Sequence, residues 1–152
     1  MLERIRFLTA GESHGKGLLG IIEGLPSNIK ISETYVKQHL SRRQKGHGRG
    51  GRMKIEDDFA EFIGGVRYGE TLGGPIGLQI KNKDWENWKD VMDHNIPEKP
   101  SKPITMLRPG HADLAGLQKF GMNDIRNILE RSSARETTMR VALGSFCRKM
   151  LE

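Results

Sequence analysis

The chemically richest stretch of this sequence is residues 42–58, where cationic side chains alternate with glycines. Glycine lets the backbone approach a ligand closely, and arginine binds carboxylate or phosphate through two parallel hydrogen bonds. The pattern predicts a loop that folds around a small polyanion. A solvated basic loop and a loop that binds the nucleic-acid backbone are the alternatives. The cations of this stretch are Arg42, Arg43, Lys45, Arg49, Arg52 and Lys54.

Two histidines in glycine-bounded loops are candidate proton carriers. His14 follows Ser13 in the loop of residues 10–17, and His111 follows a Pro-Gly turn. Histidine takes up or releases a proton near neutral pH, which suits a proton donor to a phosphate leaving group. The alternative for each is a hydrogen-bonded structural residue. The five histidines lack paired ligand spacing and there is one cysteine, so no metal site is predicted.

A third candidate site lies just before the last predicted helix, at Arg131, Ser132, Ser133 and Arg135. The free N–H groups and the dipole at a helix start bind anions. Ser133 and Glu136 also have the spacing of a capping box, in which serine caps the helix. Anion binding and simple capping are both open here.

Composition narrows the class of protein. The 152 residues fit one domain, and 25 Lys and Arg against 19 Asp and Glu favour anionic partners. Aromatic residues make up 6% of the chain, which disfavours a base-stacking surface. The single cysteine, Cys147, fits a reducing compartment. No apolar run approaches the ~18 residues of a membrane span, and the N-terminus lacks a signal pattern, so we expect a cytoplasmic protein without membrane association.

Apolar periodicity predicts the elements that must position these residues. Strands are expected at residues 4–9, 18–22, 59–66 and 75–80. Helices are expected after an N-cap at Ser32, over 112–119, over 124–130 and from Ser133 to the C-terminus. Residues 81–103 are expected to form a surface excursion whose two tryptophans pack it down or meet a partner subunit. The core stripe of the last helix is Met139, Ala142, Leu143, Phe146 and Met150.

Four motifs, in this order, resemble the N-terminal part of chorismate synthase, and the likeness covers essentially the whole chain. The third and fourth lie around His111 and Ser133. The motifs are Gly11-Glu12-Ser13-His14-Gly15 followed by Ile22-Glu23-Gly24-Leu25-Pro26; Arg42-Arg43-Gln44 with Gly48-Arg49-Gly50-Gly51-Arg52-Met53; Arg108-Pro109-Gly110-His111-Ala112-Asp113; and Glu130-Arg131-Ser132-Ser133-Ala134-Arg135-Glu136-Thr137.

The resemblance implies an α+β fold, a layered β-α-β sandwich of the chorismate synthase type, of which residues 1–152 form the N-terminal part of a single domain. It implies a phosphate lyase that needs reduced FMN and converts 5-enolpyruvylshikimate 3-phosphate to chorismate by 1,4-anti elimination, in the shikimate pathway of aromatic amino acid biosynthesis. His14 resembles the family's proton donor to the departing phosphate, and His111 the histidine close to the flavin ring.

The resemblance also assigns the anion-binding side chains. Arg43, Arg49, Arg52, Arg108 and Ser13 are expected to bind the substrate or, in bifunctional members, the phosphate of NADPH. The FMN-binding residues are expected to be Arg131, Ser132, Ser133 and Arg135. The partners implied are a phosphorylated small molecule and, for the full-length protein, the other subunits of a homotetramer, with no nucleic acid. Family members are over twice this length, so the C-terminal part is expected to be absent here and residues 1–152 alone to be inactive.

Overall fold

The computed structural model describes residues 4–45 and 55–152. Its largest sheet is antiparallel and has the strand order β1-β2-β7-β4. These strands are β1 (Arg6–Ala10), β2 (Gly17–Glu23), β7 (Ile76–Lys81) and β4 (Glu61–Gly64). They confirm the four strands expected from apolar alternation. The expected strand 59–66 is divided, because Gly65 at φ +85° turns the chain into a second sheet.

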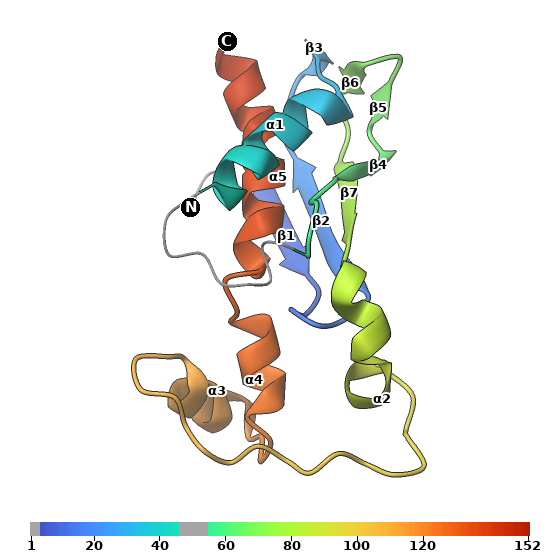
Figure 1. The fold of residues 1–152 in the computed structure, drawn as a ribbon. Helices are drawn as coiled ribbons and strands as arrows, with labels where there is room; N and C mark the ends of the chain where they lie inside the picture. The colour runs from blue at the N-terminus through green and yellow to red at the C-terminus, as the bar shows by residue number, and fades with distance from the viewer. Residues whose placement is uncertain (1–3, 46–54) are drawn as a thin grey trace.

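The second sheet is small and has the order β3-β6-β5. Its strands are β3 (Ser27–Lys30), β6 (Glu70–Leu72) and β5 (Val66–Arg67). Thr71 ties this sheet to the turn before it, since its hydroxyl donates to the Pro26 carbonyl and accepts the Ile29 N–H. In Figure 1 this sheet lies at the end of the molecule where the C-terminus also lies.

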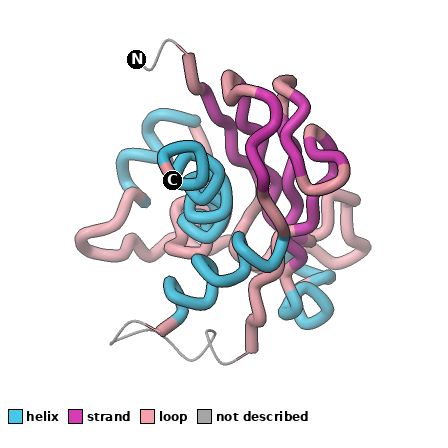
Figure 2. Tube along the Cα trace, turned by 90° about the horizontal axis from the view of Figure 1, so that it is seen from above, coloured by secondary structure: helices cyan, strands magenta, loops and turns pink. Residues whose placement is uncertain are grey.

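Helix α5 (Glu136–Leu151) packs on one face of the four-stranded sheet, and helix α1 (Glu33–Gln44) packs on α5. Figure 1 shows α5 running along the sheet with α1 crossing it, and Figure 2 shows the strands as one layer beside the helix that ends at the C-terminus. Ser32 caps α1 as predicted, because its hydroxyl accepts the Tyr35 N–H. The core lies between these layers and includes Leu18, Ile22, Val36, Leu40, Ile76, Leu78, Ile80, Met139, Leu143 and Phe146.

The remaining helices are η2 (Lys83–Asn87), α2 (Lys89–Met92), α3 (Asp113–Phe120) and α4 (Arg126–Arg131). Gly121 ends α3 in the left-handed conformation. The segment 81–103 follows the expected surface path over 93–103, where every residue is exposed. Over 83–92 it is helical instead, and this part packs on the β1–β2 loop through the ring of Trp88. No helix in the described part of the chain is long and apolar enough to cross a membrane.

Candidate functional site

The loop that carries Ser13 and His14 joins β1 to β2 and is held in shape by Asn82, which follows β7. The Asn82 amide donates to the carbonyls of Glu12 at 3.1 Å, Ser13 at 3.1 Å and Gly15 at 2.8 Å. Three carbonyls converging on one buried amide fix the path of the backbone. No role was expected for Asn82, because nothing in its local pattern shows that it faces a loop about 70 residues earlier.

His14 is oriented by Glu130, from the end of α4. Its Nδ1 lies 2.9 Å from both carboxylate oxygens of Glu130, and its backbone N–H donates to the same carboxylate at 2.7 Å. The Ser13 N–H donates to the Glu130 backbone carbonyl at 3.0 Å. The predicted histidine loop is therefore bonded to the residue just before the predicted segment Arg131-Ser132-Ser133, although Glu130 itself was not among the predicted site residues.

The imidazole of His14 is also stacked on a tryptophan. Its ring centroid lies 3.9 Å from that of Trp88, with 24° between the ring planes. The Trp88 indole N–H donates to the Asp84 carboxylate at 3.1 Å, and the same carboxylate lies 3.9 Å from Nε2 of His14. Trp88 thus packs the segment down, one of the two roles expected for it.

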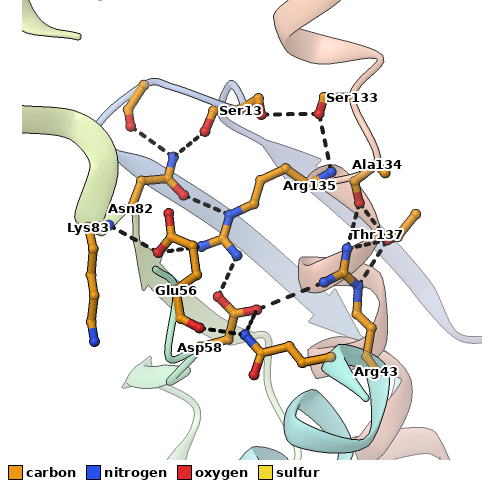
Figure 3. Close-up of polar contacts among 12 residues, drawn as sticks. Ser13, Arg43, Glu56, Asp58, Asn82, Lys83, Ser133, Ala134, Arg135 and Thr137 are labelled. Carbon is orange, nitrogen blue, oxygen red and sulfur yellow. Dashed lines mark hydrogen bonds and ion pairs between the residues drawn. The ribbon is translucent and has the colours of Figure 1, made fainter. Parts of the chain in front are cut away.

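The predicted serines of the two motifs meet. The Ser133 hydroxyl donates to the Ser13 hydroxyl at 3.1 Å, so the β1–β2 loop and the turn before α5 share one polar cluster. The structure therefore brings together three predicted residues, Ser13, His14 and Ser133. Figure 3 shows this contact above the neighbouring arginine network.

The prediction of a capping box at Ser133 and Glu136 is wrong. Helix α5 begins at Glu136, and its N-cap residue Arg135 makes no side-chain capping bond. The Ser133 hydroxyl donates to Ser13 and accepts the Arg135 N–H at 3.4 Å, and the Glu136 carboxylate accepts hydrogen bonds from Thr9 and Arg140. Tertiary partners outcompete the local capping arrangement.

The expectation that free N–H groups at the start of the last helix bind an anion is also wrong. Arg131 is the last residue of α4, and Ser132 to Arg135 form the turn between α4 and α5. The N–H groups of Glu136, Thr137 and Thr138 donate to the carbonyls three residues earlier, at 3.0–3.2 Å. These amides are therefore already bonded and do not present the free donors on which the expectation rested.

Arg135 is buried at the centre of an ion-pair network (Figure 3). Its Nε donates to the Asn82 side-chain oxygen at 2.9 Å, and its two terminal nitrogens face the carboxylates of Asp58 and, at 3.5 Å, Glu56. Burial of three charges is tolerable because each has an opposite partner. The predicted FMN ligand Arg135 is thus bonded within the chain.

Arg43 belongs to the same network. Its guanidinium donates to the Ala134 carbonyl at 2.7 Å and to the Thr137 hydroxyl at 3.0 and 3.1 Å, and lies 3.9 Å from Asp58. Arg43 thereby joins the end of α1 to the start of α5. Arg49 and Arg52 lie outside the described residues.

Arg108 and His111 lie in a different part of the fold. Arg108 donates to both oxygens of Asp113, at 3.0 and 2.8 Å, and also through its backbone N–H at 2.9 Å. These hydrogen bonds lower the pKa of Asp113 from 3.8 to about 2. His111 is exposed in the turn between the two. Within residues 4–45 and 55–152, no hydrogen bond, ion pair or ring contact joins His111 to His14.

A largely apolar pocket of about 430 Å³ lies between α3 and α4. Arg131 and Ser132 line this pocket together with Phe120, Met122 and Ile128. The Nη1 of Arg131 is buried without a hydrogen bond and lies 3.7 Å from the Glu136 carboxylate, while Nη2 donates to Thr9. An apolar hollow with a cationic side chain on its lining fits a flat ring that carries an anionic group. No group of three or more metal-ligating side chains is found in the described part of the chain.

The sequence is similar to those of known chorismate synthases. The family model for chorismate synthase matches residues 5–152. The chain is 59% identical over 151 residues to the chorismate synthase of Aquifex aeolicus, with 99% of this chain and 38% of that protein covered. It is 58% identical over 148 residues to that of Sulfurihydrogenibium sp., with 97% and 38% covered.

A solved structure gives the same result. The chain superposes on a crystal structure of chorismate synthase with a TM-score of 0.74 and 45% sequence identity, and the match covers 99% of this chain and 35% of the other. The chain therefore spans less than two fifths of the length of the relatives that it matches.

Proposed function

The chain belongs to the chorismate synthase family, and from this premise we propose that it contributes to an enzyme that eliminates phosphate from 5-enolpyruvylshikimate 3-phosphate to give chorismate. The observation that carries the proposal is the placement of His14, which is held by Glu130 and Trp88 with one ring edge still reachable. Its loop is bonded to the Arg-Ser-Ser segment, so two of the matched motifs form one site.

In this proposal His14 is the general acid. The elimination breaks the carbon–oxygen bond to phosphate, and a proton delivered to that oxygen makes phosphate a better leaving group. A side chain that is 21% exposed is accessible to a ligand yet constrained by its neighbours. His111 acts on the flavin side, as expected from the family, and its exposed position leaves it open to a ligand.

The substrate carries a phosphate and two carboxylates, so it needs several cationic partners. We assign direct contact to Arg49 and Arg52, with Ser13 from the histidine loop. Arg43 and Arg108 already donate to groups of the chain, so their contribution includes holding the site in place. In bifunctional members Arg43 and Arg49 would take the NADPH phosphate.

Arg131 and Ser132 are the residues that we propose to hold FMN, because they line the apolar pocket between α3 and α4. Ser133 and Arg135 form the turn that follows, and their direct contact with FMN stays a prediction. When bound and reduced, FMN would donate an electron transiently and recover it. The cytoplasm as location and a homotetramer as assembly complete the proposal.

The test uses residues 1–152 in place of the matching N-terminal part of the Aquifex aeolicus enzyme. With reduced FMN and substrate under anaerobic conditions, this chimaera is expected to form chorismate on the order of 1 per second. Residues 1–152 alone are expected to form none and to bind FMN weakly in a fluorescence titration. No product from the chimaera would contradict the proposed function. Binding to an oligonucleotide that weakens steeply with salt would favour the nucleic-acid alternative.

A further inference from the structure

Both carboxylate oxygens of Glu130 contact a single residue, His14. Both oxygens lie 2.9 Å from Nδ1 of His14, one of them also accepts the His14 backbone N–H, and the Glu130 side chain has no exposed surface. An ionised carboxylate only accepts hydrogen bonds, so the ring nitrogen that faces it must carry a hydrogen. The contact therefore selects the form of the imidazole that is protonated at Nδ1.

The other ring nitrogen, Nε2, is directed towards a different carboxylate. It lies 3.9 Å from Asp84, which is too long for a hydrogen bond. The stack on Trp88 holds the plane of the ring, and the two contacts with Glu130 favour the orientation in which Nδ1 faces that residue. The neighbours thus set which nitrogen faces Glu130 and which is left for a ligand.

We propose that Glu130 is a positioning residue for His14, which makes Nε2 the atom that gives its proton to the departing phosphate. The Nε2–H bond breaks as the phosphate O–H bond forms, its electron pair stays on Nε2, and the ring is left neutral with Nδ1–H intact. That product is the tautomer that the Glu130 carboxylate binds. The inference rests on the proposed function for its proton acceptor, whereas the tautomer itself is independent of it.

The first experiment reads the tautomer directly in the 152-residue chain. Long-range proton–nitrogen correlation spectra at about pH 9, where imidazoles are neutral, are expected to show His14 protonated at Nδ1 and bare at Nε2. A His14→Gln variant assigns the signals, and the exposed His111 serves as the internal comparison. Neutral imidazole in water favours the Nε2–H form, so a His14 signal of that form would overturn the proposal.

The second experiment is a double-mutant cycle in the chimaera with the Aquifex aeolicus enzyme. Glu130→Ala is expected to lower kcat about 10²-fold with little change in KM, and to add almost nothing in the His14→Ala background, because the two residues act as one unit. Equal losses in both backgrounds would show a structural role alone and overturn the proposal.

The control variant is Glu33→Ala, which removes another carboxylate that accepts a backbone N–H, from Phe62 at 3.1 Å. It is expected to leave kcat unchanged. Failure of the unaltered chimaera to make chorismate would count against the proposed function, and the spectra would then decide the role of Glu130.

Discussion

Asp58 and Arg135 form a buried ion pair between residues 77 positions apart in the sequence. Asp58 is the last residue of the basic, glycine-rich stretch 42–58, and Arg135 ends the turn before α5. The Gln44 amide donates to the same carboxylate at 3.1 Å, from the other side of that segment. Asp58 therefore ties both ends of the basic segment to the turn that carries Ser133.

Asp58→Asn is expected to destabilise the chain by about 3 kcal/mol, the lower end for a broken buried pair, because the buried guanidinium of Arg135 loses its nearest carboxylate but keeps Glu56 at 3.5 Å. Urea unfolding followed by circular dichroism measures the free energy of unfolding. The matched control is Glu61→Gln, which removes an exposed ion pair with Lys81. An exposed pair contributes about 0–1 kcal/mol, so similar losses for the two variants would contradict the buried-pair interpretation.

Asp113 gives stability a dependence on pH in the acid range. Hydrogen bonds from Arg108 lower its pKa in the folded chain to about 2, against 3.8 as the ordinary value. A carboxyl with a lowered folded-state pKa stabilises the fold above its unfolded pKa, and that contribution is lost as the pH falls from about 4 towards 2. We expect the urea midpoint to fall over this interval, and to fall less in Asp113→Asn.

The control for Asp113 is Asp57→Asn. Asp57 pairs with Lys37 at 3.2 Å, but both side chains are exposed. This variant is expected to keep the acid dependence of the parent chain. If Asp113→Asn and the parent chain lost stability equally between about pH 4 and 2, the Arg108 pair would not be the cause.

The sequence predicted those features that depend on local spacing. Ile76, Leu78 and Ile80 alternate on β7, and Ser32 caps α1, because periodicity and capping act over a few residues. The contacts that build the site act over longer separations. Glu130 meets His14 across 116 positions, and no local pattern indicates which carboxylate will face the imidazole. The same reason explains why the predicted capping box does not form, since the Ser133 hydroxyl donates to a partner 120 positions away.

The stack of His14 on Trp88 can be followed by fluorescence. In a Trp85→Phe chain the only tryptophan left is Trp88, so its emission reports on the ring stacked against it. Adding His14→Gln removes that ring and is expected to change the intensity of the Trp88 emission at a fixed pH. Equal emission with and without His14 would contradict the stack.

Two helical glycines allow the packing of α3 on α4 to be tested apart from helix propensity. Replacing a glycine by alanine inside a helix stabilises it by about 1 kcal/mol when the new methyl group meets nothing. Gly144 in α5 is such a position, since a Cβ added there would have no atom of another element within 4 Å. We expect Gly144→Ala to raise the free energy of unfolding by about this amount.

Gly116 in α3 gives the opposite expectation. A Cβ there would lie 2.4 Å from Cγ2 of Ile128, a buried side chain of α4, so the methyl group forces the two helices apart. Overpacking of this kind costs about 1–3 kcal/mol, which exceeds the gain in helix propensity. Gly116→Ala should therefore destabilise the chain and, because Gly116 and Ile128 line the pocket beside Arg131, also weaken the FMN binding that we propose for this pocket. If Gly116→Ala matched Gly144→Ala in unfolding and in FMN titration, α3 would not pack tightly on α4 and the pocket would not be the flavin site.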